Sequence, residues 1–253
     1  MHQIIQVDEK NLTDYPQVVC FINPSNAYFG LKVDWLKNRF SEGLTMKVIK
    51  PDQVGKVAGY IEYVPGEFAW RAVNASGYMF IHCLWVYPNN NKKKGLGSAL
   101  LEEVEADARN AKMKGVTVIS SDGAFMANRD LFLKNGYTIK EEMEKCQLLV
   151  KNFSGDQSDL GFNNTTEARS NLKGWHMIYS GQCPWVARFV EEAKPIIKEH
   201  RLDINIRELT TAREAQHAPS VYSVFNLIRD GKLLADRYIS TTRFKNILNK
   251  ELN

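Results

Sequence analysis

Residues 78–101 read YMFIHCLWVYPNNNKKKGLGSALL and combine three different patterns. The first ten residues are aromatic, branched or otherwise apolar, which is typical of a buried strand. Three asparagines, three lysines and two glycines follow, and apolar residues then recur at helical spacing after Gly97. The stretch therefore predicts a buried strand, a short basic turn and a helix.

The basic turn lies where a ligand can meet the start of a helix. The first amide groups of a helix lack intrahelical partners, and the helix dipole favours an anion there. Glycine lets a ligand approach the backbone closely. These properties predict a polyphosphate site, with a solvated basic turn as the alternative. The residues concerned are Lys92, Lys93, Lys94, Gly95, Leu96, Gly97 and Ser98.

Other phosphate-binding motifs do not fit this turn. The GxxxxGK[ST] spacing of a Walker loop and the GxGxxG spacing of a dinucleotide fold are both missing from it. A Walker-type nucleotide site or a dinucleotide site is therefore excluded here.

The rest of the N-terminal half predicts a mixed α and β domain. We expect a strand from residue 4 that leads into a helix near Asp14, and a helix over 31–43 that Gly43 could end. Further strands are expected over 45–50, 56–64, 116–121 and 144–152, and helices over 98–113 and 125–137.

A polar segment divides the chain. Residues 151–171 are rich in Ser, Asn, Asp and Thr and have no sustained apolar period, which indicates a loop. We therefore predict domains over 1–150 and 172–253, joined by the linker 151–171. The second domain should contain strands at 175–180 and 203–209, helices at 186–200, 211–216 and 241–252, and a hairpin around Asp230-Gly231.

Composition limits the class of protein. A chain of 253 residues with a net charge of +4 and no basic tail is not a dedicated nucleic-acid binder. We expect no secretory signal and no membrane partner, because no apolar run approaches the roughly 18 residues of a membrane span. The four cysteines are scattered without zinc spacing, so we expect reduced thiols, no metal and a cytoplasmic location.

Residues 78–101 resemble the central signature of the GNAT acyltransferases. In that family an apolar strand ends in a Val-x-Pro-like step, here Val86 to Pro88, and [Q/R]-x-x-G-x-[G/A] and a long helix follow. Here Lys92 stands at the position of the usual Gln or Arg, with Gly95 and Gly97 at the two small positions. The resemblance covers residues 1–150 and continues through 116–121 and 131–137.

The resemblance implies the GNAT acyl-CoA N-acyltransferase fold, an α/β (α+β) fold with a mixed, mostly antiparallel sheet. It implies acetyl-CoA as co-substrate, with the pyrophosphate held by the backbone amides of the turn. Trp85 and Val86 would pair with the pantetheine arm like an added strand. The backbone N–H of Val86 would polarise the thioester carbonyl.

His82 is the expected general base. Strand alternation predicts that Phe80, His82, Leu84 and Val86 share one face, and many GNAT proteins carry a Glu or His four residues before the Val. An imidazole, with an unperturbed pKa of about 6.5, suits proton removal from an amine. Its alternative role is that of a core histidine. Glu62 is the second candidate, with a solvated strand face as its alternative.

The family's general acid has no counterpart at its usual place. The resemblance puts Phe132 where the family often has a Tyr, while Tyr137 falls at a packing position. The family's Asn near the start of that helix is also displaced, because Phe125 holds its usual spacing and Asn128 is offset.

The element order of residues 172–253 resembles the thioredoxin fold. Cys183-Pro184 matches the place of the redox cysteine, and Pro219 matches the family's cis-proline. Val186 stands where a second cysteine is expected, so an intramolecular CxxC disulfide is excluded. Cys183 could be a monothiol site or a packing residue. A GNAT domain followed by this module resembles the YoaP-like acetyltransferases.

These features together predict an N-acetyltransferase. It would move acetyl from acetyl-CoA directly to the amine of a small-molecule or peptide acceptor. The alternative is a catalytically weak CoA-binding protein or a monothiol redox protein that uses Cys183. The acceptor and the oligomeric state are left open by the sequence.

Overall fold

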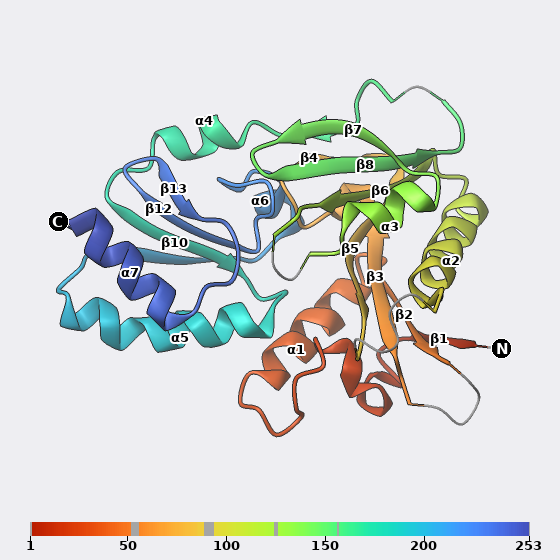
Figure 1. Cartoon of the computed structure of the whole chain (residues 1–253), viewed down its shortest axis with the longest axis horizontal. Helices are drawn as coiled ribbons and strands as arrows, with labels where there is room; N and C mark the ends of the chain where they lie inside the picture. The colour runs from red at the N-terminus through yellow and green to blue at the C-terminus, as the bar shows by residue number, and fades with distance from the viewer. Residues whose placement is uncertain (1, 52–55, 89–93, 124–125, 156, 253) are drawn as a thin grey trace. The chain divides into compact units, whose positions relative to one another are not determined.

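The computed structural model describes the whole chain except residues 1, 52–55, 89–93, 124–125, 156 and 253 (Figure 1). The chain forms two compact units. The first unit comprises Met1–Pro24, Leu36–Ala69 and Val73–Phe162, and the second comprises Ser25–Trp35, Trp70–Ala72 and Asn163–Asn253. The second unit thus includes two short segments from the N-terminal half. The domain boundaries expected from the sequence stay a prediction.

The first unit is built on a seven-stranded sheet of order β1-β2-β3-β5-β6-β8-β7. Neighbouring strands are antiparallel except β5 and β6, which are parallel. This confirms the mixed, mostly antiparallel sheet. The strands are β1 (Gln3–Val7), β2 (Thr45–Lys50), β3 (Gly59–Pro65), β5 (Tyr78–Val86), β6 (Gly115–Ser120), β7 (Thr138–Met143) and β8 (Cys146–Asn152). A separate pair joins β4 (Val73–Asn74) and β9 (Gly161–Phe162).

The long helix α2 (Leu96–Asn110) covers one face of this sheet. Its apolar side packs on β3, β5 and β6 because Leu100, Val104 and Ala108 recur at helical spacing. The other helices of the N-terminal half are α1 (Phe29–Phe40) and α3 (Arg129–Lys134). Three 3₁₀ turns complete it: η1 (Leu12–Asp14), η2 (Pro16–Val18) and η3 (Gly66–Phe68).

The region near Asp14 forms two 3₁₀ turns, and the helix expected there is not formed. Pro16 opens the second turn and has no amide hydrogen to donate to a preceding carbonyl. β7 was not expected from the sequence, because its residues are mostly exposed and charged and lack a clear apolar alternation.

A β-bulge interrupts β5 at His82. Cys83 pairs with Glu62 on β3, whereas Ile81 pairs with Tyr63, so β5 holds one residue more than its partner between these pairs. The extra residue reverses the sheet face on which each later side chain of β5 lies. Leu84 and Val86 therefore pack in the same core as Met79 and Ile81.

The expectation that His82 shares a face with Leu84 and Val86 is therefore wrong. The imidazole lies beside the ring of Phe80, with the ring centroids 5.6 Å apart. His82 thus belongs to the sheet face opposite the core that contains Leu84 and Val86.

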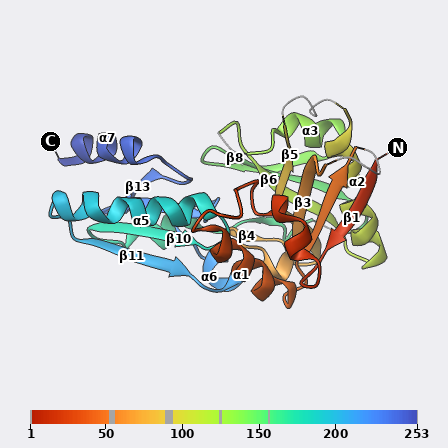
Figure 2. The same ribbon diagram turned by 90° about the horizontal axis from the view of Figure 1, so that it is seen from below.

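The second unit contains a four-stranded sheet of order β11-β10-β12-β13. Its strands are β10 (Trp175–Ser180), β11 (Ile204–Leu209), β12 (Phe225–Arg229) and β13 (Lys232–Ala235). Its helices are α4 (Thr165–Ser170), α5 (Pro184–Glu199), α6 (Ala212–Gln216) and α7 (Thr241–Leu252). From β10 onward the element order agrees with the sequence expectation. α5 and α7 lie side by side (Figures 1 and 2) and share a core with the sheet.

Two details of the second unit differ from expectation. The peptide bond before Pro219 is not cis, because the cis bond found in the described part of the chain is Tyr87-Pro88. Residues 165–170 form α4 inside the expected linker, and Asn164 caps this helix by accepting from the amide of Glu167 at 3.1 Å. The likeness of this unit to thioredoxin stays a prediction.

Candidate active site

β5 separates from β6 before either strand ends. Their parallel pairing begins at Tyr78 and Gly115 and ends at Ile81 and Val118. β5 continues to Val86 while it remains paired with β3. Its edge beyond Ile81 therefore presents backbone groups on the side from which β6 has diverged.

Backbone direction identifies which groups face this opened edge. The amide of Tyr87 donates to the carbonyl of Ala58 on the β3 side at 2.8 Å. Successive residues of a strand direct their backbone groups to opposite sides, so the N–H groups of Leu84 and Val86 point away from β3. The N–H of Trp85 points toward β3, and its ring lies 6.1 Å from that of Phe21.

A glycine allows β3 to approach β5 closely at this level. Gly59 pairs with Val86. A Cβ atom at Gly59 would lie 2.7 Å from the carbonyl oxygen of Trp85, closer than real contacts allow. The glycine therefore helps to fix the backbone of β5 where Val86 presents its amide.

The N-terminus of α2 is a second group of backbone donors. Gly95 is its N-cap, has a left-handed conformation at φ 79° and makes no side-chain cap hydrogen bond. The hydrogen bond from Ala99 N to Gly95 O opens the helix. The amides of Leu96, Gly97 and Ser98 come before Ala99 in the chain and have no acceptor within the helix. They can therefore donate to an anion.

The turn residues differ in what they could offer a ligand. The side chain of Leu96 is buried in the core, so its amide is the group that can serve a ligand. Gly97 and Ser98 are half-buried, while Lys94 and Gly95 are exposed. Lys92 and Lys93 lie outside the described residues.

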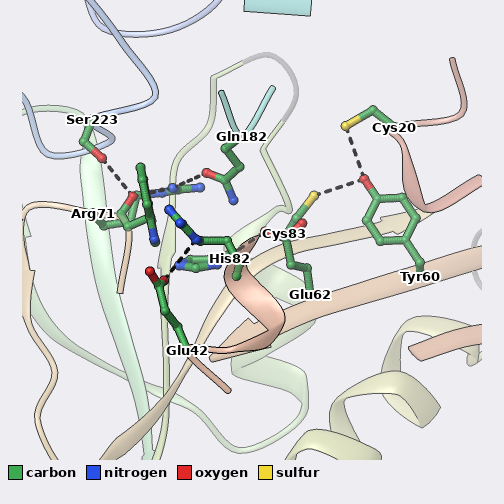
Figure 3. A network of polar contacts seen from close by, with 11 residues as sticks. Cys20, Glu42, Tyr60, Glu62, Arg71, His82, Cys83, Gln182 and Ser223 are labelled. Carbon is green, nitrogen blue, oxygen red and sulfur yellow. Dashed lines mark hydrogen bonds and ion pairs between the residues drawn. The ribbon is translucent and has the colours of Figure 1, made fainter. Parts of the chain in front are cut away.

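Glu62 and His82 form a buried pair on β3 and β5 (Figure 3). Nδ1 of His82 lies 3.3 Å from a carboxylate oxygen of Glu62, and the two residues are 5% and 1% exposed. His82 is the extra residue of the bulge, next to Cys83, which pairs with Glu62, and its imidazole lies on the same sheet face as Glu62. A carboxylate at Nδ1 favours the tautomer with hydrogen on Nδ1, which leaves the Nε2 lone pair to act as a base.

Tyr60 joins two cysteines in the first unit (Figure 3). Its hydroxyl donates to Sγ of Cys20 at 3.7 Å and lies 3.4 Å from Sγ of Cys83. Burial raises the pKa of Tyr60 well above its usual value, and the two cysteines and Glu62 raise it further. The sequence contains no motif for this group, because its members lie in three separate segments.

The structure gives no hydroxyl at the family's general-acid position. Phe132 is fully buried, and its ring centroid lies 5.6 Å from that of Tyr137. Burial raises the pKa of the nearby Tyr137 hydroxyl, which keeps it neutral within the core. Asn128 caps α3 by accepting from the amide of Asp130 at 2.8 Å, and Phe125 lies outside the described residues.

The two predicted thiol-site residues both belong to the second unit. Cys183 is the N-cap of α5, half-buried against the core of that unit. Pro219 is buried, and its carbonyl accepts from the guanidinium of Arg169 at 3.1 Å. Cys183 and Pro219 belong to the same unit of the chain.

A buried arginine anchors the segment Trp70–Ala72 within the second unit (Figure 3). The guanidinium of Arg71 donates to the carbonyl of Trp70 and to Oε1 of Gln182, both at 2.6 Å. It also lies over the ring of Tyr222, 4.3 Å from the centroid. The hydroxyl of Ser223 donates to the same Trp70 carbonyl at 2.9 Å. These contacts explain why a short N-terminal segment belongs to this unit.

The described residues contain neither a metal-binding cluster nor a membrane-spanning helix. No cluster of three or more His, Cys, Asp or Glu side chains suitable for a metal ion occurs among them. Within the same residues, none of the helices combines the length and apolar character needed to cross a membrane.

Comparison with known proteins finds a family model that matches part of the N-terminal half of the chain. Residues 14–137 match the model of the acetyltransferase (GNAT) family. An uncharacterised N-acetyltransferase of Bacillus subtilis (strain 168), YoaP, is 26% identical over 251 residues, which cover 97% of this chain and 98% of the relative. The family match confirms the resemblance carried by residues 78–101.

Two solved structures are also similar. The structure of yncA from Salmonella typhimurium with its cofactor acetyl-CoA is 18% identical, with a TM-score of 0.45, and covers 62% of this chain and 96% of that chain. A ribosomal-protein-alanine N-acetyltransferase from Brucella melitensis is 19% identical, with a TM-score of 0.43, and covers 60% of this chain and 99% of that chain.

Proposed function

Because the chain contains an acetyltransferase domain of the GNAT family over residues 14–137, we propose that it transfers acetyl from acetyl-CoA directly to the amine of a small-molecule or peptide acceptor. The observation that carries this proposal is the opened edge of β5. There the strand offers backbone groups to a ligand without a change in its pairing to β3. A sheet with only a structural role would have no use for backbone groups left unpaired between two neighbouring strands.

The backbone donors of the first unit suit the two ends of acetyl-CoA. The pantetheine arm carries amides that can pair with the β5 edge at Leu84 and Val86, as an added strand does. The pyrophosphate suits the amides of Leu96, Gly97 and Ser98 at the start of α2. Lys94 is exposed beside them and adds positive charge. The pattern thus fits a long ligand that has both an amide-containing arm and a pyrophosphate.

Acetyl transfer needs a donor for the thioester carbonyl and a base for the amine. The N–H of Val86 points to the opened edge and supplies the donor, which stabilises negative charge that develops on the carbonyl oxygen. His82 supplies the base, and Glu62 orients its imidazole. Since His82 and Glu62 are both buried, we expect a water molecule to carry the amine proton to His82.

The experiment that tests this function measures acetyl transfer to a panel of amines. The purified protein is mixed with acetyl-CoA and one amine from a panel of polyamines, amino acids, aminoglycosides and short peptides. Release of CoA thiol and a mass increase of about 42 Da on the acceptor are the two readouts, from the replacement of one amine hydrogen by acetyl. Amine-dependent CoA release with acetylated acceptor supports the proposal, whereas release without any acetylated acceptor contradicts it.

Cys183 separates this proposal from a monothiol redox function. A Cys183→Ser variant should transfer acetyl at the native rate, because the thiol is the N-cap of α5 and is not among the proposed base and backbone donors. The measurement is kcat/KM with the best acceptor of the panel. A loss of more than about tenfold, which is roughly 1.4 kcal/mol in the transition state, would assign Cys183 a role in the reaction.

A further inference from the structure

The hydroxyl of Tyr60 brings the sulfurs of two cysteines close together. It donates to Sγ of Cys20 at 3.7 Å and lies 3.4 Å from Sγ of Cys83 (Figure 3). Because both sulfurs contact the same oxygen atom, their separation cannot exceed these two distances combined. The thiols therefore start within a few ångströms of the distance at which a disulfide forms.

The two cysteines differ in how firmly the backbone holds them. Cys83 lies within β5, paired with Glu62 on β3. Cys20 lies in a turn outside any helix or strand, and both Cys20 and Phe21 have a left-handed backbone at φ 52°. Such conformations are uncommon for residues other than glycine. Cys20 is therefore the partner that can move, because a turn carries fewer ladder hydrogen bonds than a strand.

Access distinguishes this pair from another cysteine of the same unit. Cys20 and Cys83 are both half-buried, whereas Cys146 is buried. A small oxidant can therefore reach the pair from solvent. Tyr60 itself is buried, and its raised pKa keeps the hydroxyl protonated as a donor to the thiol sulfur.

We propose that Cys20 and Cys83 are a redox modification site that forms an intramolecular disulfide when the protein meets hydrogen peroxide. The first thiol loses its proton, the thiolate attacks a peroxide oxygen, and the O–O bond breaks to give a sulfenic acid and hydroxide, which takes up that proton and becomes water. The second thiolate attacks the sulfenic sulfur, the S–S bond forms, and hydroxide leaves and is protonated to water. The two thiols lose two electrons in total, and the peroxide is reduced to two water molecules.

The disulfide changes the strand that carries the proposed base. Cys83 directly follows His82 at the bulge of β5, and the hydroxyl of Tyr60 must leave its place at Cys83 when the sulfurs join. We therefore expect oxidation to lower acetyl transfer and a dithiol reductant to restore it. This effect on activity rests on the proposed function, while formation of the disulfide does not.

The test is a peptide map of the full chain after treatment with hydrogen peroxide. Remaining thiols are blocked with an alkylating reagent, and the protein is digested without reduction. The expected result is a linked pair of peptides that contains Cys20 and Cys83, with loss of two of the four thiols and no change in the mass of the intact monomer beyond about two hydrogens. Dithiothreitol should release the link.

Two variants serve as matched controls. Cys183→Ser should still form the link, and Cys20→Ser should not, because each removes one half-buried thiol but only the second belongs to the pair. Alkylation of both Cys20 and Cys83 in the oxidised native protein, or a link that involves Cys183 or a second chain, would overturn the proposal. Failure of acetyl transfer by the reduced protein, in a chain that still forms the link on oxidation, would count against the proposed function and leave the redox site standing.

Discussion

Replacement of His82 by alanine is expected to lower kcat for acetyl transfer by about 10²- to 10⁴-fold, the usual contribution of a general base. KM for acetyl-CoA should change little, because the proposed cofactor contacts are backbone groups of β5 and α2. The native rate should fall toward acidic pH, where the imidazole gains a proton and can no longer accept one from the amine. The variant should lack this acidic decline.

The variant removes a buried partner of Glu62, so folding must be controlled. His82→Gln keeps a side chain that can donate to the carboxylate of Glu62 but cannot serve as a base at neutral pH. It should remain folded in a thermal melt and show the same loss of kcat. Native kcat with an unchanged acidic limb in either folded variant would remove His82 from the mechanism.

Glu62 should act through His82, and this can be measured in the same experiments. Glu62→Gln is expected to lower kcat less than His82→Ala does, because it removes orientation and charge but leaves the imidazole. In the double variant the two effects should not add, since the carboxylate has no function once the imidazole is gone. Full additivity would show that Glu62 works independently of His82.

Replacement of Gly97 by phenylalanine is expected to weaken acetyl-CoA binding by at least about 100-fold. The new side chain would displace the first turn of α2, whose amides are the proposed phosphate donors, and each charge-assisted hydrogen bond lost to phosphate costs about 1.5–3 kcal/mol. A Cβ atom at Gly97 would already lie 3.3 Å from Leu131 and 3.9 Å from Leu84, so little room is left beside the helix. Isothermal titration with acetyl-CoA measures the change.

A matched variant separates this effect from a general disturbance of α2. Ala106→Phe adds the same ring to the same helix at an exposed position away from its N-terminus. It should bind acetyl-CoA with native affinity. Native affinity in a folded Gly97→Phe protein would contradict the assignment of the phosphate site to this turn.

Local pattern was sufficient to predict the strand and the helix within residues 78–101, while residues 89–93 of the turn between them lie outside the described residues. The aromatic and branched residues of β5 and the helical spacing of α2 are properties of consecutive residues, and these are where single-sequence reasoning is strongest. The helix begins at Leu96, close to its expected start, because Gly95 takes a left-handed conformation as its N-cap. The Asp230-Gly231 turn between β12 and β13 followed from the same kind of local signal.

The structural features that the sequence did not predict depend on contacts between residues distant in sequence. The bulge at His82 arises from the pairing of β5 with β3, and a strict alternation of faces cannot anticipate an extra residue. Tyr60, Cys20 and Cys83 meet across 40 and 23 residues of sequence, so no spacing rule could group them. The attachment of Trp70–Ala72 to the second unit likewise depends on contacts of Arg71 with Gln182 and Tyr222.

The most direct test of the central claim is amide hydrogen exchange of the native protein with and without acetyl-CoA. We predict slower exchange in peptides that contain residues 84–86 and 96–98 when the ligand is present, because the amides of Leu84 and Val86 would donate to the pantetheine arm and those of residues 96–98 to the pyrophosphate. Amide exchange in β8 and in the second unit should change little on binding. Unchanged exchange in both peptides at saturating acetyl-CoA would contradict the binding of acetyl-CoA at the β5 edge and the start of α2.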